Sequence, residues 1–196
     1  YTGMADVAAL TGDKAYLSAI DDIWHDGVDK KLYITGGIGA TGNGEAFGDD
    51  YDLPNMSAYA ETCAAIANVY WNQRMFLLHG DAQYVDVLER TLYNGLLSGI
   101  SLSGDKFFYP NPLASMGQHQ RRAWWDCACC VSNMTRFLPS VPGYTYAQNQ
   151  NIELPQKYKY GNESDTTSIA DIKWQEFYKE KELILKGSFG TEIFSY

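Results

Sequence analysis

The sequence has little positive charge and no long apolar run. Its 15 lysines and arginines stand against 24 aspartates and glutamates, so the net charge is −9 and the pI is about 4.7. An acidic chain argues against nucleic acid or an anionic membrane surface as a partner. Because no run of about 18 apolar residues is present, we expect no membrane span.

The chain also opens without an initiator methionine or a leader. Its first residues are Tyr1-Thr2-Gly3 rather than a charged segment followed by an apolar one, so we expect an internal piece of a longer protein or a processed chain. The 196 residues, 45% of them hydrophobic, are enough for one compact domain with a core. The aromatic share of 14% suits either a carbohydrate site or an ordinary core.

Cysteine is scarce, and its four copies lie in two short clusters, Glu61-Thr62-Cys63 and Cys127-Ala128-Cys129-Cys130. Adjacent cysteines rarely pair and the clusters are far apart in sequence, so we expect no disulfide framework. A carboxylate with several thiolates suits Zn²⁺, and buried reduced cysteines are the alternative. The absence of paired CxxC motifs argues against a closed zinc knot. Free thiols favour the cytoplasm, and a periplasmic or secreted chain would have the same composition.

Joint coordination by these residues makes demands on the backbone. Residues i and i+2 of a helix point about 200° apart, so Glu61 and Cys63 cannot both face one ion from a helix interior. If the metal is real, the helix expected there must break or begin near residue 61. By the same reasoning we expect a non-helical backbone at Cys129 and Cys130.

The periodicity predicts an all-α fold. Helices are expected over residues 4–10, 14–26, 56–78, 83–98 and 132–140. The segment from Leu10 to Tyr16 resembles the one from Leu78 to Tyr84, each with Gly-Asp between two helical patterns. Repeated helix–Gly-Asp–helix hairpins are typical of an α/α toroid, although one pair of repeats can arise by chance.

Three segments interrupt the helical pattern. Residues 33–55 are rich in glycine and should form a long loop, which in a compact domain is usually functional. Residues 106–109 suggest a short strand ended by Pro110. From about residue 149 the chain is polar and loses its periodicity, so we expect a separate tail over 149–196 after a domain at 1–148.

Several other polar residues have a catalytic and a plainer interpretation. Glu45 lies beside Phe47, where apolar surroundings would favour a general acid, but a solvated loop glutamate is the commoner case. His119 precedes arginines and tryptophans that could contact a sugar, and an exposed loop explains it equally well. For His25 a surface or capping role is favoured, and for His79 a structural role. Asp49-Asp50 more plausibly cap or solvate the loop than bind a cation.

The motifs together resemble glycoside hydrolase family 127, the β-L-arabinofuranosidases. The resemblance covers about residues 1–148 and rests on an ordered set of motifs: Gly36-Gly37-Ile38-Gly39, Gly44-Glu45-Ala46-Phe47-Gly48, Leu53-Pro54-Asn55, Tyr59-Ala60-Glu61-Thr62-Cys63-Ala64, Phe108-Tyr109-Pro110-Asn111-Pro112-Leu113 and the stretch from Trp124 to Asn133. It implies the C-terminal half of an (α/α)6 catalytic barrel. It also implies a retaining glycosidase that uses a zinc-bound cysteine as its nucleophile.

Carried over residue by residue, the resemblance makes Cys129 the nucleophile and Glu45 the general acid/base. It makes Tyr109 a sugar contact and supplies four zinc ligands: Glu61, Cys63, Cys129 and Cys130. The implied partner is an arabinofuranosyl glycan or glycopeptide. A homo-oligomer or a further polypeptide could complete the barrel.

The sequence departs from the family pattern in a few places. Cys127 matches a motif cysteine without an assignable role, and Val131 stands where a proline is expected. By the resemblance, we expect the first half of the barrel and the family's β-domains to lie outside the residues given, and the tail weakly resembles the N-terminal region of outer-membrane efflux proteins. Two other functions therefore stay open, an inactive zinc-binding helical fragment and a protein-interaction module.

Overall fold

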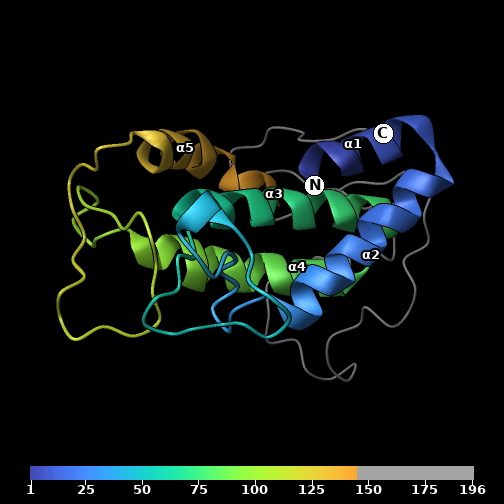
Figure 1. Ribbon diagram of the computed structural model, residues 1–196. Coiled ribbons are helices and arrows are strands. Elements are labelled where there is room, and N and C mark those ends of the chain that lie inside the picture. Colours follow the sequence, from blue (N-terminus) through green and yellow to red (C-terminus); the bar gives the residue numbers. More distant parts are fainter. Residues whose placement is uncertain (145–196) are drawn as a thin grey trace, which may run out of the picture. The chain divides into compact units, whose positions relative to one another are not determined.

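The computed structural model describes residues 1–144, and the regular secondary structure of this part is helical, with long loops between α2 and α3 and before α5 (Figure 1). The elements are α1 (Thr2–Thr11), α2 (Lys14–Lys30), η1 (Asn43–Glu45), α3 (Thr62–His79), α4 (Ala82–Arg90), η2 (Thr91–Leu96), η3 (Leu97–Gly99), α5 (Cys129–Phe137) and η4 (Leu138–Tyr144). Extended structure within residues 1–144 is limited to isolated bridges. The all-α prediction is confirmed. The expected strand at 106–109 is reduced to bridges of Phe107 with Ile100 and Arg122.

The chain divides into two compact units. The first consists of Tyr1–His79 and Gln83–Thr135, and it contains the core and every candidate site residue. The described part of the second consists of residues 80–82 and 136–144, and in it the Phe137 ring stacks on Tyr144 at 5.7 Å. The predicted tail at 149–196 lies outside the described residues, so the division into 1–148 and 149–196 stays a prediction. No helix of residues 1–144 has the length and apolar content needed to cross a membrane.

The turn between α1 and α2 has the structure that its Gly-Asp pair predicts. Gly12 adopts φ 64° and its N–H donates to Ala8 O at 2.9 Å, which ends α1. The Asp13 carboxylate accepts from Ala15 N at 2.8 Å and caps α2. Gly80, in the second Gly-Asp pair, has a similar φ of 67°. Helix boundaries near both pairs are therefore set locally.

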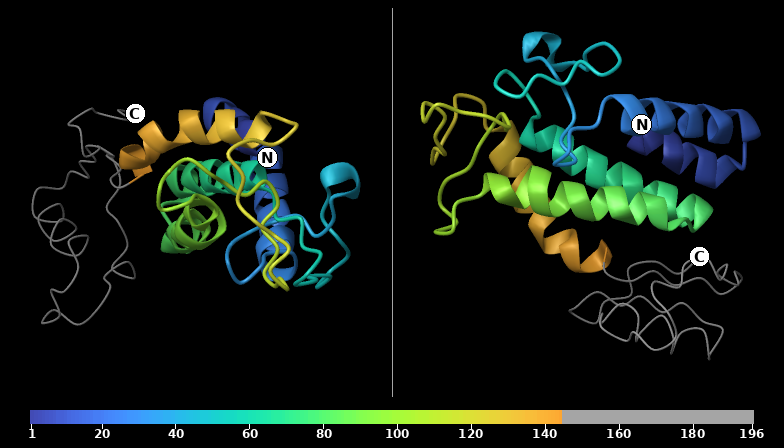
Figure 2. Two further views of the ribbon diagram at one scale, coloured as in Figure 1. Left: turned by 90° about the vertical axis from the view of Figure 1, so that its left-hand side faces the viewer. Right: turned by 90° about the horizontal axis from the view of Figure 1, so that it is seen from below.

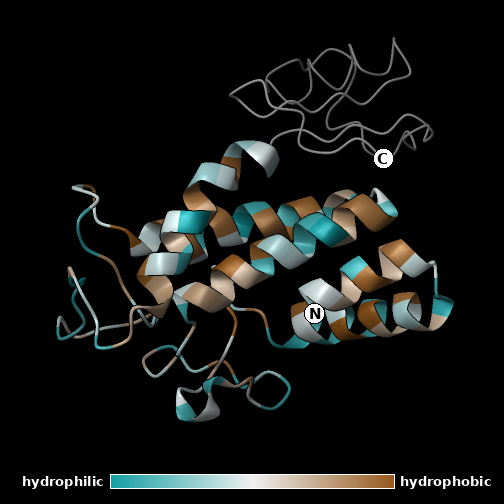
Figure 3. Cartoon of the chain, turned by 90° about the horizontal axis from the view of Figure 1, so that it is seen from above, coloured by the Kyte–Doolittle hydropathy of each residue, from teal (hydrophilic) through white to brown (hydrophobic). Residues whose placement is uncertain are grey.

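The core of the first unit is built around α3. Helix α1 packs against α2 and α3, and α3 runs beside the α4–η2 segment (Figure 2, right). Apolar and polar residues mix along these helices (Figure 3), and the apolar ones meet in one buried cluster: Ala5, Ile20, Trp24, Trp71, Met75, Tyr84 and Val87. Burying side chains of this size stabilises the fold by about 1.5–3 kcal/mol each.

A row of buried amides crosses this core and joins it to the long loop. Trp24 Nε1 donates to Asn72 Oδ1 at 2.8 Å, and Asn72 Nδ2 donates to Asn68 Oδ1 at 2.9 Å. Asn68 Nδ2 in turn donates to Gly36 O at 3.2 Å and to Thr91 Oγ1 at 3.1 Å. Since a buried polar group without a partner costs about 1–3 kcal/mol, this row fixes where the loop meets the helices.

The helix expected over 83–98 is not regular to its end. It widens into a π turn at Thr91–Leu96 and tightens into a 3-10 turn at Leu97–Gly99. The close approach of the loop accounts for the change: Gly36 lies directly against Thr91, and Gly95 approaches Thr35 O so closely that a Cβ there would be 3.2 Å away.

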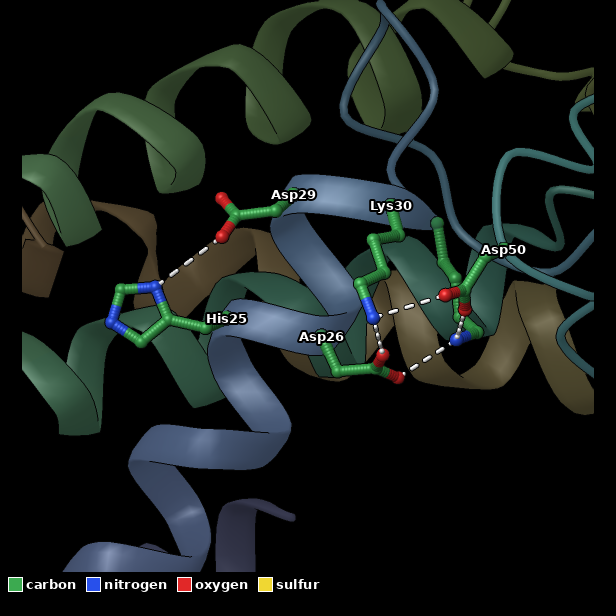
Figure 4. A network of polar contacts seen from close by, with 6 residues as sticks. His25, Asp26, Asp29, Lys30 and Asp50 are labelled. Atoms are coloured by element: carbon green, nitrogen blue, oxygen red, sulfur yellow. Dashed lines mark hydrogen bonds and ion pairs between the residues drawn. The ribbon is translucent and has the colours of Figure 1, made fainter.

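The predicted loop between α2 and α3 is confirmed, with only the short η1 turn inside it. A clamp of four residues ties it to the end of α2, namely Asp26, Lys30, Lys31 and Asp50. Figure 4 shows Asp26, Lys30 and Asp50 of this clamp. The Lys30 ammonium lies 3.2 Å from Asp26 and 3.0 Å from Asp50, and Lys31 lies 2.8 and 2.7 Å from the same carboxylates. Tyr51 N also donates to Lys30 O at 3.0 Å.

Candidate metal and active site

Both cysteine clusters meet in the first unit. One ligand atom from each of four residues falls within a group whose members all lie within 4.8 Å of one another: Glu61, Cys63, Cys129 and Cys130. Cys63 Sγ is 2.9 Å from Cys129 Sγ and 3.3 Å from Cys130 Sγ. The Glu61 carboxylate is 3.4 Å from Cys130 Sγ and 3.9 Å from Cys129 Sγ. Glu61 and Cys130 are buried, and the other two are half-buried.

The start of α3 presents Glu61 and Cys63 to the same point. The helix expected over 56–78 begins only at Thr62, so Glu61 lies outside the regular helix and follows Ala60, whose φ is 37°. The late start required for joint coordination is therefore confirmed. Glu61 O accepts the first helical hydrogen bond, from Ala65 N at 3.0 Å, so the helix begins immediately after Glu61.

Thr62 locks this turn to the segment that contains Tyr109. Thr62 N donates to Tyr109 O at 3.0 Å, and Thr62 Oγ1 donates to Phe108 O at 2.7 Å. Asn111 Nδ2 donates to Ala60 O at 2.8 Å and to Thr62 Oγ1 at 3.0 Å. Thr62 is fully buried, so these bonds hold the two residues on either side of it in a fixed orientation.

Cys129 and Cys130 are the first two residues of α5, so the expected non-helical backbone is wrong. Neighbouring residues of a helix differ by about 100° in direction, and at a helix end this still allows two sulfurs to reach one point. Asn133, one turn on, donates to Cys63 Sγ at 3.2 Å and lies 3.8 Å from Cys129 Sγ. The helix end thus supplies two thiols and an amide donor.

The donor set is one that could hold a metal ion such as zinc. At bond lengths of about 2.0–2.3 Å, tetrahedral ligands lie roughly 3.3–3.8 Å apart. The two carboxylate–sulfur distances, 3.4 and 3.9 Å, are close to that spacing, whereas the sulfur–sulfur distances of 2.9 and 3.3 Å are shorter than the spacing of two thiolate ligands. Burying a charged carboxylate among three thiols costs free energy when no positive charge is nearby. A divalent cation bound by these four residues would compensate their negative charge.

The three thiols hold their protons unequally. Hydrogen bonding with Cys130, and then with Cys129, lowers the pKa of Cys63 to about 7 against an opposing effect of burial. The bond to Cys63, reinforced by burial, raises the pKa of Cys129 to about 12 and also raises the pKa of Cys130. The protein's own hydrogen bonds therefore favour the thiolate at Cys63. Because its pKa is raised, Cys129 favours the protonated thiol near neutral pH, and a bound cation would favour its thiolate, since a metal ligand loses its proton.

Tyr109 lies against this cluster. Its hydroxyl is close enough to Cys127, Glu61 and Cys130 for each of them to act on its pKa, and its ring lies 6.3 Å from the Tyr59 ring. Burial, followed by the bond to Cys127, raises the pKa of Tyr109, so the phenol is a neutral donor at physiological pH. Its position beside the thiols is compatible with the expected sugar contact, which stays a prediction.

Glu45 reaches the same neighbourhood through a second tyrosine. It lies at the end of η1 with φ 50° and is exposed, and Tyr59 Oη donates to its Oε1 at 3.0 Å. The Tyr59 and Tyr109 rings are 6.3 Å apart. Burial, followed by the bond to Glu45, raises the pKa of Tyr59. Glu45 is thus bonded to a tyrosine whose ring neighbours Tyr109, the tyrosine that lies against the thiol cluster.

His119 is held by the segment around Tyr109. Its Nε2 lies 2.9 Å from Pro110 O, and its ring stacks on Phe108 at 4.5 Å. The Arg121 guanidinium lies over the Phe108 ring, 4.5 Å from its centroid, and the Arg122 guanidinium lies 4.6 Å from the centroid of the Trp125 ring. The His119 and Trp125 rings are 6.5 Å apart, and Trp124 is exposed. A role of these residues in sugar binding stays a prediction.

The remaining candidates take the plainer roles. His25 lies on the surface of α2, 3.6 Å from Asp29 (Figure 4), and His79 Nε2 lies 2.8 Å from Asp21 Oδ1. Asp50 belongs to the clamp with Lys30 and Lys31. Three residues near the site were not singled out from the sequence: Tyr59, Asn111 and Asn133. Tyr59 and Asn111 lie inside recognisable motifs, but their contacts depend on how the loops fold back.

Known proteins resemble this chain over the region that carries the site. The sequence profile described as the β-L-arabinofuranosidase GH127 catalytic domain matches residues 1–143. A non-reducing end β-L-arabinofuranosidase of Bifidobacterium longum subsp. longum is 39% identical over 158 residues, covering 75% of this chain and 24% of that protein.

Two solved structures agree with the fold. A GH127 β-arabinofuranosidase is 68% identical with a TM-score of 0.73, covering 74% of this chain and 23% of that one. A GH127 β-L-arabinofuranosidase from Geobacillus stearothermophilus T6 is 44% identical with a TM-score of 0.73, covering 76% and 25%. The chain thus spans about a quarter of the length of the relatives it matches. From this match and from the site geometry, we conclude that the chain belongs to glycoside hydrolase family 127, the β-L-arabinofuranosidases.

Proposed function

We propose that this chain carries the catalytic thiol and acid/base of a retaining β-L-arabinofuranosidase that releases β-L-arabinofuranose from a glycan or glycopeptide. The observation that supports this best is that Glu45 accepts a hydrogen bond from Tyr59 Oη at 3.0 Å, and that the Tyr59 ring lies 6.3 Å from the ring of Tyr109, which lies against the thiol group. A nucleophile and a proton donor must reach the same glycosidic bond from their separate positions. Membership of the family gives the substrate class.

Zinc is the metal that the donor set favours, with Glu61, Cys63, Cys129 and Cys130 as its ligands. When bound, it would hold thiol sulfur as thiolate near neutral pH and restrain its position. The carboxylate ligand Glu61 adds negative charge, so the thiolate keeps its electron density for attack.

The reaction then needs two steps by this chain's own residues. In the first, Cys129 Sγ attacks the anomeric carbon and forms a C–S bond while the C–O bond to the leaving group breaks and Glu45 protonates the leaving oxygen. In the second, Glu45 takes a proton from water, the water oxygen bonds to the anomeric carbon, and the C–S bond breaks to return the thiolate. Two inversions at one carbon retain its configuration.

The test combines metal analysis with an assay on p-nitrophenyl β-L-arabinofuranoside. We expect about one zinc per chain and turnover that is lost in Cys129→Ser. Glu45→Gln should slow hydrolysis of substrates with poor leaving groups by about 10²–10⁴-fold while zinc stays bound. Cys127→Ser is the matched control, because Cys127 is exposed and lies outside the ligand group.

The other outcomes select the alternatives. Zinc without turnover would indicate a metal-binding helical fragment, which the coverage of about a quarter of the relatives' length makes a specific second candidate. A protein with neither zinc nor turnover would contradict the site and leave an interaction module with buried reduced cysteines.

A further inference from the structure

We propose that Tyr59 is a positioning residue for Glu45, holding its carboxylate in the orientation from which it protonates the leaving group. The inference rests on the proposed function for the role of Glu45. It goes beyond that function by assigning a task to a residue that is not a member of the candidate ligand group.

Glu45 needs an external support because its surroundings give it little. It is exposed, and it lies in a tight turn closed by Ala46 N donating to Thr41 O at 3.1 Å. Among the residues that the structure describes, no salt bridge reaches this carboxylate, and its recorded side-chain hydrogen bond is the one from Tyr59 Oη at 3.0 Å. A free glutamate side chain loses up to about 1.5–2 kcal/mol of rotamer entropy when it is fixed.

Tyr59 is itself held in place through the peptide group that follows it and through its ring. Its carbonyl accepts from Asn111 N at 2.9 Å, and its successor Ala60 donates to Gly39 O at 2.8 Å. Its ring fills the space above Gly42, where a Cβ would approach to 3.1 Å. The loop therefore wraps onto the tyrosine ring, and the phenol projects from a backbone that is fixed before the substrate arrives.

The spacing along the chain makes this support useful. Tyr59 precedes the metal-ligand candidate Glu61 by two residues, and Asn111 bonds to the backbone on both sides of Ala60. The short segment from Tyr59 to Glu61 thus positions both the acid/base and one residue of the thiol cluster. A misplacement of about 1 Å at a reacting group can lower the rate about 10²-fold, so positioning both groups from one segment has a large effect.

The test compares two arabinofuranosides that differ only in the leaving group. Methyl β-L-arabinofuranoside depends on protonation of its leaving oxygen, whereas p-nitrophenyl β-L-arabinofuranoside depends on it little. We expect Tyr59→Phe to lower kcat/KM for the methyl glycoside by about tenfold or more and for the nitrophenyl glycoside by less than about threefold. Tyr51→Phe, at an exposed tyrosine of the same loop, is the matched control.

A double-mutant cycle and a structural readout complete the experiment. In a Glu45→Gln background, Tyr59→Phe should cause no further loss on the methyl glycoside, because the group that it positions has gone. Amide hydrogen exchange at residues 43–46 should be faster in Tyr59→Phe, with zinc content unchanged.

Each result has one meaning. Equal losses on the two substrates, or no loss on either, would overturn the positioning role while leaving the proposed function intact. If the unmodified chain turns over neither substrate, the proposed function fails for this chain. The contact is then judged by exchange alone, and unchanged exchange at residues 43–46 in Tyr59→Phe would overturn it.

Discussion

The two halves of the candidate site are built in opposite ways. The thiol cluster lies at the starts of α3 and α5, with Glu61 and Cys130 buried. Glu45 lies in an exposed turn of the long loop, and one phenol supports its carboxylate. A metal site tolerates little displacement of its ligands, so helix ends and buried bonds suit it. An acid/base must meet substrate and water, so a loop with local support suits it.

The bonds that support the two halves also differ in burial and charge. Around Thr62 the hydrogen bonds are buried and uncharged, and losing one costs free energy because its remaining partner is left unsatisfied. The clamp of Asp26, Lys30, Lys31 and Asp50 is solvated and ionic, so salt and pH act on it directly. The four predictions below test this contrast, from the largest expected effect to the smallest.

The largest effect is expected when the loop is pushed away from the buried amides that hold it. Gly36→Ala should destabilise the protein by more than about 3 kcal/mol. Gly36 has φ 81°, and an added Cβ would lie 2.5 Å from Thr91 Oγ1 and 2.6 Å from Thr91 Cα. Gly44→Ala is the matched control: its φ is 71° with no atom within 4 Å of the Cβ, so only backbone strain of about 1–2 kcal/mol is expected.

Urea unfolding of both variants measures the difference. Similar losses at Gly36 and Gly44 would contradict the argument from contact with Thr91 and leave backbone strain as the whole effect.

Metal removal should act on the thiol half and spare the loop half. If the cluster binds zinc, a chelator should lower the free energy of unfolding by about 2.7–4.1 kcal/mol for metal previously at 100–1,000 times its Kd. Amide exchange should rise at the starts of α3 and α5 and stay constant at residues 49–53. The matched control is Cys63→Ser, which removes a ligand and should make stability insensitive to the chelator. An unchanged melting temperature in the unmodified chain would argue that the cluster is empty in solution.

The same contrast separates what the sequence predicts from what it does not. The thiol half is predictable because side-chain directions within a helix decide it. Glu61 and Cys63 cannot both face one ion from a regular helix, and α3 indeed begins at Thr62. Gly12 and Asp13 likewise mark the first hairpin turn by local rules. The prediction of a non-helical backbone at Cys129 and Cys130 is wrong because neighbouring residues differ by only about 100° in direction, and at a helix end both can still reach one point.

The loop half resisted prediction for a physical reason. The bond from Tyr59 to Glu45 joins residues 14 apart through a chain reversal, and no periodicity encodes it. Asn111 lies 49 residues from Thr62, and its role depends on two loops meeting. The π turn at Thr91–Leu96 arises from packing against Gly36 rather than from helix propensity. Such contacts follow from tertiary structure alone.

A smaller effect is expected at the bond network that orients Glu61. Asn111→Ala removes donors to Ala60 O and Thr62 Oγ1, and we expect a loss of about 1–3 kcal/mol in stability together with weaker zinc binding. Asn94→Ala is the matched control, because its amide donates to Arg90 O on an exposed face. Zinc affinity measured by competition with a chromogenic chelator should change only in the first variant. An equal effect in both would deny Asn111 a role in the metal site.

The smallest effect is expected at the clamp, and its pH dependence has a definite sign. Bonds to Lys31, then Lys30, hold the pKa values of Asp26 and Asp50 below the usual 3.8. The contribution of these carboxylates is therefore complete well above pH 3.8 and is lost as the pH falls through their lowered values. Lys31→Met should reduce the protection of the Tyr51 amide, which donates to Lys30 O, at neutral pH and low salt.

The difference between Lys31→Met and the unmodified chain should shrink at about 1 M salt, where screening acts within roughly 3 Å, and below the lowered carboxyl pKa values. Lys14→Met, at the exposed start of α2, is the matched control and should leave Tyr51 unaffected. Protection factors compared at each pH remove the intrinsic pH dependence of exchange. A difference that persists at high salt would mean that Lys31 supports the loop through its apolar stem. The loop half would then depend on packing in the same way as the thiol half.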